Sequence, residues 1–172
     1  MESLCDAIIE AGLNIEWHAI VYPMLINAKV AKKMAGAGCV GVSLGFESGS
    51  PKILSALNKR FSPDDVRRVS EVLRNFGISR MGFLLLGGPG ETRGTVAESV
   101  SFAESLKLES VKLTAGIRIY PNSALAKEAV RRGLLPPDSN LLYPTFFLEP
   151  ELNGWLQEEV VRLAEKNDAW VA

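Results

Sequence analysis

Hydrophobic and polar residues alternate along four stretches of the chain, and between these stretches apolar residues recur every three or four positions. The alternating or continuously apolar stretches predict strands at residues 15–22, 39–46, 78–86 and 111–119. The stretches with helical spacing predict helices at residues 2–11, 26–35, 51–57, 62–76, 96–106, 123–133 and from about residue 151 onward. Strand and helix therefore alternate four times after one leading helix. This order favours a parallel sheet with right-handed crossovers and a functional edge at the carboxyl ends of the strands.

The stretch Gly41–Lys59 contains the strand with the clearest two-sided pattern. One side of this strand is bulky and apolar, with Val40, Val42, Leu44 and Phe46. The other side is nearly bare and ends in a carboxylate, with Gly41, Ser43, Gly45 and Glu47. A strand that packs helices on one side and leaves space on the other suits a ligand-holding α/β barrel. The glycines equally suit close packing against a neighbouring strand, and the pattern leaves both interpretations open.

Residues 78–86 are almost continuously apolar, which is typical of a parallel strand covered on both faces. The segment Gly87–Thr92, Gly-Gly-Pro-Gly-Glu-Thr, turns the chain between this strand and the next helix. Such a loop can present its amides to a phosphate or a carboxylate, or it can be only a tight turn. Neither a phosphate-loop motif nor a complete dinucleotide-binding motif accompanies it.

The periodic pattern changes at Gly133. Residues 134–172 begin with an aperiodic loop that contains prolines and end in one amphipathic helix. We therefore expect an α/β unit over residues 1–133 and a loop-and-helix extension over residues 134–172 that packs on it.

The composition gives no support for several classes of partner. Of the 172 residues, 47% are hydrophobic, and the formal net charge of −1 gives no electrostatic reason to expect nucleic acid or an anionic membrane. No apolar run is long enough to span a membrane, and the first residues are acidic where a signal peptide is basic. A cytoplasmic protein is therefore expected.

Cysteine and histidine are too few for several catalytic mechanisms. The chain has two cysteines, Cys5 and Cys39, far apart among apolar residues, and one histidine, His18. We expect buried thiols and a histidine with a satisfied structural role. Neither a catalytic triad nor a metal site can be assembled from them.

The remaining polar features follow three of the predicted strands. They are Glu47 with Ser48, residues 85–92 and residues 118–121. If the strands are neighbours in a curved parallel sheet, these features meet at one mouth. They predict a small-molecule site without specifying its chemistry.

Four segments resemble successive signatures of radical S-adenosylmethionine (SAM) enzymes. In chain order they are Glu16–Ala19, Gly41–Lys59, Phe83–Thr92 and Gly116–Leu125. The resemblance is closest to the branch that often carries an upstream cobalamin-binding domain. It implies a partial TIM-like (β/α) barrel with outer helices, of which the four units here are the last four.

The resemblance also implies an oxidoreductase or transferase in which a 4Fe-4S cluster cleaves SAM reductively to a deoxyadenosyl radical. The implied cofactors are SAM, the cluster and, in the full-length protein, cobalamin. The family's motif Cys-x-x-x-Cys-x-x-Cys is absent, and Cys5 with Cys39 cannot replace it. We therefore expect a fragment, inactive by itself, without metal ligands of its own. The cluster ligands would lie in an upstream segment of the same polypeptide, and the substrate would be a small molecule.

The resemblance assigns roles to polar residues around the second strand. Glu47 matches a Glu or Gln that lies beside bound SAM and is expected to hydrogen-bond its polar portion, and Ser48 follows it in the same motif. Lys59 falls where relatives often have Arg or Lys near the methionine carboxylate, although a solvated lysine at a helix end is an equal alternative.

The resemblance also assigns roles on the next two strands. Leu85 matches a position whose backbone meets the adenine, and Gly87 begins the adjoining loop. Phe83 stands where some members have a ribose-binding Asp, which puts a ribose contact from that strand in doubt. Arg118 resembles the arginine of the Gly-x-Arg-x-Tyr-Pro segment and predicts an anionic contact, with a structural salt bridge as the alternative.

Two other functions remain open at this stage. The first is a non-radical α/β module that binds a phosphate-bearing small molecule at Gly87–Thr92. The second is an interaction module, self-association included, that uses an exposed edge of the barrel, because an unpaired strand edge invites pairing with another chain.

Overall fold

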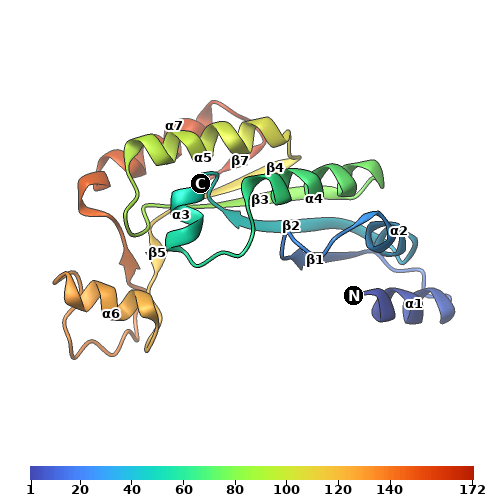
Figure 1. Ribbon diagram of the computed structural model, residues 1–172, viewed down its shortest axis with the longest axis horizontal. Coiled ribbons are helices and arrows are strands. Elements are labelled where there is room, and N and C mark those ends of the chain that lie inside the picture. Colours follow the sequence, from blue (N-terminus) through green and yellow to red (C-terminus); the bar gives the residue numbers. More distant parts are fainter.

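Five parallel strands form the main sheet of the computed structural model, which describes residues 1–172 (Figure 1). The strand order is β1-β2-β3-β4-β7, so neighbours in the sheet are also successive in the chain. The strands are β1 Trp17–Val21, β2 Cys39–Glu47, β3 Ser79–Leu86, β4 Ser110–Ala115 and β7 Trp170–Val171. The α/β fold with parallel pairing and outer helices that the sequence predicts is confirmed.

Seven helices accompany the strands along the chain. They are α1 Glu2–Glu10, α2 Ala28–Gly36, α3 Pro51–Ala56, α4 Pro63–Asn75, α5 Arg93–Leu106, α6 Ala124–Arg131 and α7 Trp155–Glu165, with a 3-10 turn at Pro150–Leu152. In Figure 1, α4, α5 and α7 lie along the same side of the sheet. On the other side α6 projects beyond the carboxyl ends of the strands, and no helix crosses the middle of the sheet.

Local sequence explains where the two longest helices begin. The Ser62 hydroxyl accepts a hydrogen bond from the Asp65 amide, and the Asp65 carboxylate accepts one from the Ser62 amide. Thr92 and Thr95 make the equivalent pair at the start of α5. Each cap satisfies amide groups that the first helical turn leaves without partners, and such a cap typically contributes about 1 kcal/mol.

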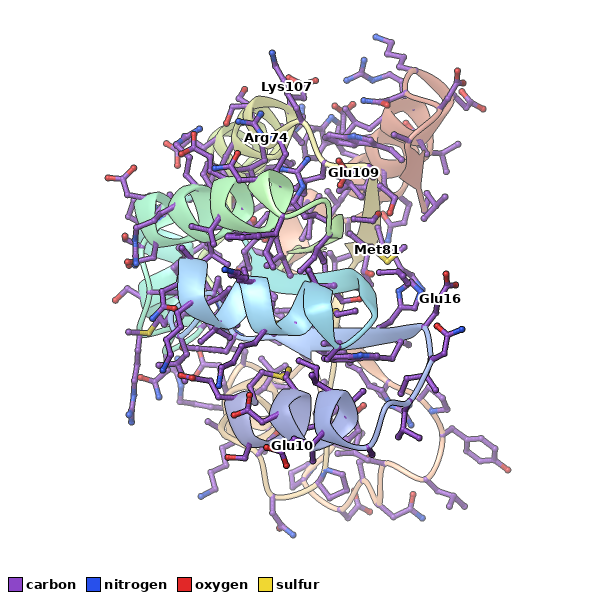
Figure 2. All side chains as sticks on the ribbon, turned by 90° about the vertical axis from the view of Figure 1, so that its right-hand side faces the viewer. Glu10, Glu16, Arg74, Met81, Lys107 and Glu109 are labelled. Carbon is purple, nitrogen blue, oxygen red and sulfur yellow. The ribbon has the colours of Figure 1, made fainter.

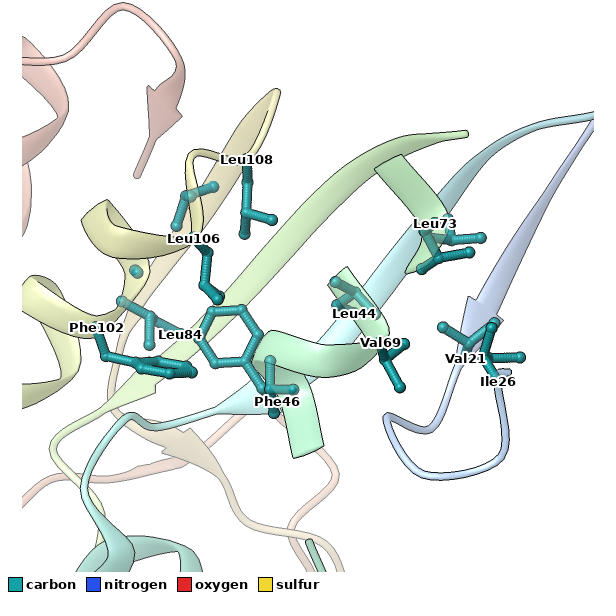
Figure 3. Packing of buried hydrophobic residues seen from close by; sticks show 14 of the residues in the cluster. Val21, Ile26, Leu44, Phe46, Val69, Leu73, Leu84, Phe102, Leu106 and Leu108 are labelled. Atoms are coloured by element: carbon teal, nitrogen blue, oxygen red, sulfur yellow. The ribbon is translucent and has the colours of Figure 1, made fainter. Parts of the chain in front are cut away.

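The core lies between the helices and the bulky side of the strands. Figure 3 shows Leu44 and Phe46 of β2 beside Leu84 of β3, with α4 and α5 residues over them. The rings of Phe46 and Phe102 meet edge to face, with centroids 5.6 Å apart. Burial of each such side chain contributes about 1.5–3 kcal/mol. The apolar side predicted for β2 is therefore the side that packs.

β3 differs from the prediction that both of its faces are covered. Gly82, Leu84 and Leu86 are buried under the helices, whereas Phe83 and Leu85 on the opposite face are only half-buried. An apolar run shows that a strand can be covered on both faces, but covering the second face requires another layer, and this chain places none there.

The predicted strand 111–119 is two strands. It breaks at Gly116, where φ is +87° and a Cβ atom would lie 3.1 Å from the Phe147 carbonyl oxygen. Beyond this break, β5 Ile117–Arg118 pairs antiparallel with β6 Phe146–Phe147 in a separate two-stranded sheet. Alternation in the sequence continues across the glycine, so the break was not predicted.

The C-terminal residues add a strand that the sequence pattern did not reveal. β7 is two residues long and pairs with β4, with Trp170 opposite Val111. Trp170 is buried, and α7 buries Leu156 and Val160 as its spacing predicts. A two-residue strand is too short to show a period.

Arg80 on β3 is buried among the helices at the amino end of the sheet. Its guanidinium donates to both carboxylate oxygens of Glu109, to the Ser70 hydroxyl and to the Lys107 carbonyl. Figure 2 views this end of the molecule and shows where Glu109 and Lys107 lie. Burial would raise the pKa of Glu109, but the hydrogen bonds from Arg80 outweigh it and lower that pKa.

Candidate functional site

The bare side of the sheet forms an open face, defined by the half-buried and exposed side chains that point away from α4, α5 and α7. These residues are His18 and Ile20 of β1, Ser43, Gly45 and Glu47 of β2, Phe83 and Leu85 of β3, and Lys112 and Thr114 of β4. The side chains in the middle of the open face are small or apolar, and the Glu47 carboxylate lies at the edge formed by the carboxyl ends of the strands. It is an open surface rather than an enclosed cavity.

The two glycines of β2 have different surroundings on the open face. A Cβ atom on Gly41 would lie 2.7 Å from Nδ1 of His18, so this glycine makes room for the histidine ring. A Cβ atom on Gly45 would meet only the Glu47 carboxylate, at 3.9 Å. Close packing therefore explains Gly41, whereas Gly45 leaves free space beside Glu47.

His18 does not have the satisfied structural role that was predicted. Its side chain is exposed on the open face and makes no hydrogen bond, although it packs over Gly41. The prediction was wrong because β1 is the edge strand and no layer covers this side of it.

Glu47 and Lys59 form an ion pair at the carboxyl edge of the open face. Glu47 ends β2 in a left-handed conformation, with φ of +66°. After α3, Asn58 is also left-handed, and the Lys59 amide donates to the Leu54 carbonyl, which turns Lys59 back toward the strand. Each side chain is 20% exposed. The structure therefore brings together two residues that the sequence predicted separately.

Ser48 has a different position from its neighbour Glu47. It is fully buried, its hydroxyl lies 2.8 Å from the Ser99 hydroxyl, and it accepts from the Ser50 amide at 3.1 Å. The Gly49 amide also donates to Ser99. These bonds hold the turn after β2 against α5, so Ser48 supports the position of Glu47 and does not face the open side.

The amides of the Gly87–Thr92 loop already have partners. Oε2 of Glu91 accepts from the Gly87 and Gly88 amides, and Oε2 of Glu149 accepts from the Gly90 amide at 2.9 Å. Two carboxylates of the chain thus occupy the donors that a phosphate would need. This arrangement argues against the phosphate-binding alternative and supports a tight turn.

Glu91 and Glu149 were not predicted as site residues. Glu91 is 1% exposed, and its second oxygen, Oε1, has no hydrogen-bond partner. Burial raises the pKa of this carboxyl above its ordinary value, against the hydrogen bonds from Gly87 and Gly88, which lower it. A carboxylate next to a glycine turn is a sequence signal for Glu91. Glu149 is distant in sequence and gave no such signal.

Leu85 and Arg118 lie near the same edge on other strands. Leu85 is half-buried on the open face, opposite Thr114 of β4. Arg118 is exposed on β5, stacks over Tyr120 at 5.0 Å from the ring centroid, and forms no salt bridge. The alternative of a structural salt bridge for Arg118 was therefore wrong, and its anionic contact stays a prediction.

The chain lacks a donor set for a metal ion or cluster. No three residues among His, Cys, Asp and Glu are grouped as metal ligands would be. Cys5 and Cys39 are free and buried, as predicted, and burial raises the pKa of both thiols. None of the helices is both long and apolar enough to cross a membrane.

Comparison with known proteins gives one family and a consistent set of relatives. The Radical SAM superfamily matches residues 1–103. "Uncharacterized methyltransferase PH0819" of Pyrococcus horikoshii is 31% identical over 157 residues, which cover 91% of this chain and 34% of that protein. "Tryptophan 2-C-methyltransferase" of Streptomyces laurentii is 27% identical over 111 residues, which cover 61% of this chain and 18% of that protein. The chain thus spans about a third or less of these relatives.

A solved structure shares the same architecture. TsrM from Kitasatospora setae, a radical SAM methyltransferase with tryptophan substrate and a SAM analogue bound, has a TM-score of 0.71 and 25% identity. The similarity covers 76% of this chain and 27% of that chain.

Proposed function

We propose that this chain, which belongs to the radical SAM superfamily, forms part of the SAM site of a radical SAM methyltransferase. The observation that carries the proposal is the Glu47–Lys59 ion pair at the rim of the open face, beside the free space at Gly45. Methyl transfer is supported by the two methyltransferase relatives, which are 31% and 27% identical to the chain.

The opposite charges of Glu47 and Lys59 suit the methionine end of SAM, which carries one amino and one carboxylate group. Glu47 would accept from the amino group, and Lys59 would bind the carboxylate. Because the two side chains have no other ion-pair partners, SAM would replace one internal ion pair with two to the ligand. Leu85, on the neighbouring strand, would present its backbone to the adenine.

The residues of this chain do not fit an iron–sulfur cluster. The two cysteines are buried apart from the open face, and the chain provides no third thiolate. A 4Fe-4S cluster, held by residues outside this chain, would supply the electron for SAM cleavage. Cobalamin is proposed for the whole protein because the similar TsrM has a structure with cobalamin and a 4Fe-4S cluster bound.

The contribution of the chain's own residues is to hold SAM and limit its movement. The buried Ser48–Ser99 contact fixes the turn after Glu47, and Glu91 fixes the loop after Leu85. A rigid rim keeps the reacting bond of SAM in one orientation, which is the usual contribution of a protein to cofactor chemistry.

Titration of SAM into the intact protein, reconstituted with iron and sulfide, tests the proposal. Glu47→Ala should weaken binding by about 1.5–3 kcal/mol, the range for a hydrogen bond to a charged group. Glu98→Ala is the matched control, because Glu98 is exposed on α5 and forms no ion pair. Unchanged affinity of Glu47→Ala would remove Glu47 from the SAM site.

A second candidate function, an interaction module, is favoured by the free edge of β1. This strand pairs only with β2, and its Ile20 side chain is 87% exposed. A second copy of the chain could pair with this edge. Sedimentation velocity at rising concentration tests this candidate, and a strict monomer would count against it.

A further inference from the structure

A cavity of about 510 Å³ lies at the carboxyl end of the sheet, between the end of α3 and the start of α6. Its volume falls within the range of about 300–1,000 Å³ that is typical of small-molecule sites. Leu57 forms the wall from α3, Pro89 the wall from the glycine loop, Ile117 the wall from β5, and Leu125 the wall from α6. Four segments that are distant in sequence therefore line one partly open space.

The cavity is lined mainly by apolar side chains. Leu57, Ile117 and Leu125 are each half-buried, so each exposes apolar surface to the space. Water in contact with such surface is released when an apolar group binds, and this release favours binding. Asn58 and Glu128 are the polar residues of the lining.

Glu128 does not give the cavity a free negative charge. Its carboxylate pairs with Arg131, the last residue of α6, and with Arg132, which follows it. Hydrogen bonds from these two arginines lower the pKa of Glu128 to about 2. The carboxylate is thus ionised but neutralised by its partners, and an uncharged ligand suits the cavity better than a cation.

The cavity lies beside the segment that carries Lys59, because its lining residue Asn58 immediately precedes Lys59. Leu57 is two residues before Lys59, which pairs with Glu47. Leu57 and Ile117 also approach each other across Gly88: a Cβ atom there would lie 2.8 Å from Ile117 and 3.8 Å from Leu57. A larger residue at position 88 would displace the Ile117 side chain, so Gly88 makes room for one wall of the cavity.

The α6 wall is tied to the glycine loop by a polar chain. Arg132 donates to Glu128 and to Glu149, and Glu149 accepts from the Gly90 amide. The Glu149 amide also donates to the Gly87 carbonyl, at 2.9 Å. The wall that faces the ligand is therefore held at a fixed distance from the loop beside Leu85.

We propose that this cavity binds an uncharged, apolar part of the substrate, with Leu57, Ile117 and Leu125 as specificity-determining residues. The proposal rests on the proposed function, because it takes the SAM site at Glu47 and Lys59 as the neighbouring site. It names the class of substrate: a small molecule with a neutral apolar group of aromatic or branched aliphatic type, directed toward α6.

Methyl NMR of the chain during titration with indole, a neutral apolar probe, tests the proposal. Saturable shifts are expected at the methyl groups of Leu57, Ile117 and Leu125, with none at Val161, which is exposed on α7. Shifts confined to other methyl groups, or none at all, would overturn the proposal.

A filled-cavity variant provides the second measurement. Ala124 is exposed at the start of α6 and lines the cavity, so Ala124→Trp should fill it without disturbing the core. The dissociation constant for indole should rise at least tenfold. Lys127→Trp adds the same side chain to α6 outside this cavity and should leave indole binding intact. Equal indole affinity in Ala124→Trp and the unmodified protein would overturn the proposal.

A parallel SAM titration separates this inference from the proposed function. One outcome is that Glu47→Ala binds SAM as tightly as the unmodified protein while indole still shifts the three methyl groups. This outcome would overturn the proposed function and the substrate role of the cavity, and the cavity would remain a ligand site. Normal SAM behaviour with no indole binding would overturn only the cavity proposal.

Discussion

The two ends of the sheet each contain a charged pair, and the pairs are bonded very differently. At the amino end, Arg80 is 2% exposed, and each of its guanidinium nitrogens donates to the protein, with Glu109, Ser70 and Lys107 as acceptors. At the carboxyl end, Glu47 and Lys59 have each other and no further side-chain hydrogen bond, and each is 20% exposed.

This difference separates a structural pair from one that is available to a ligand. A buried arginine with a complete set of acceptors cannot exchange partners without leaving charge and carbonyl groups unsatisfied. A partly exposed pair with spare hydrogen-bonding capacity can exchange its partner for a ligand at little cost. In (β/α) barrels, the carboxyl end of the strands is also the end that carries the site.

The largest expected effect is at the amino end. Arg80→Ala should lower the free energy of unfolding by about 3 kcal/mol, because Arg80 is buried and its loss leaves the Ser70 hydroxyl and the Lys107 carbonyl without their donor. Urea unfolding monitored by circular dichroism measures the change. Arg74→Ala is the control: Arg74 is exposed and forms no ion pair, so a change within about 0.5 kcal/mol is expected. A loss below 1 kcal/mol for Arg80→Ala would contradict the structural role of this pair.

An intermediate effect is expected at Glu91, which supports the carboxyl end from inside. Glu91→Ala should lower the free energy of unfolding by about 2 kcal/mol, because the Gly87 and Gly88 amides lose their acceptor. Glu91→Gln keeps an acceptor oxygen for these amides and should therefore lower the free energy of unfolding by less than Glu91→Ala does. If Glu91→Ala unfolds at the same urea concentration as the unmodified chain, the glycine loop does not depend on this carboxylate.

The pH dependence of stability sharpens the test of Glu91. Its folded-state pKa is raised above 4.5, mainly by burial, so the folded protein binds this proton more tightly than the unfolded chain does. The contribution of Glu91 protonation to the free energy of unfolding is complete below pH 4.5, and it is lost as the pH rises through the raised folded-state pKa. Glu91→Gln should remove this dependence, whereas Glu98→Gln, on the exposed side of α5, should retain it.

The smallest effect on stability is expected at the carboxyl-end pair. Lys59→Met should change the free energy of unfolding by less than about 1 kcal/mol, because partly exposed ion pairs contribute little. The same variant should weaken SAM binding, measured by calorimetry on the intact protein. If Lys59→Met strongly lowered the free energy of unfolding and left SAM affinity unchanged, the Glu47–Lys59 pair would be structural, like the pair at the amino end. That result would contradict the comparison.

Several parts of the fold were predictable because neighbouring residues decide them. The caps at Ser62 and Thr92 depend on groups three residues away. The bulky side of β2 follows from the two-residue period of a strand. The family was also predictable, because four motifs in order carry more information than any one of them, and the match over residues 1–103 confirms it.

The site itself was only partly predictable. Sequence motifs singled out Glu47 and Lys59 one by one, but their contact depends on the left-handed turn at Asn58. Ser48 belongs to the same motif as Glu47, yet burial against Ser99 of α5 gives it a supporting position. Glu149 reaches the glycine loop only because β5 and β6 bring its segment there.

The sequence by itself determined the order of the first four strands and their helices, the helix caps, the bare side of β2 and the family, since each depends on residues close together in the chain. Tertiary structure alone decided that Gly41 makes room for His18 while Gly45 leaves free space. It also decided that the glycine loop binds the chain's own carboxylates, and that α3 and α6 flank a partly open cavity. These features depend on contacts between segments that are distant in sequence. Such contacts form only when the whole chain packs, and no local sequence pattern predicts them.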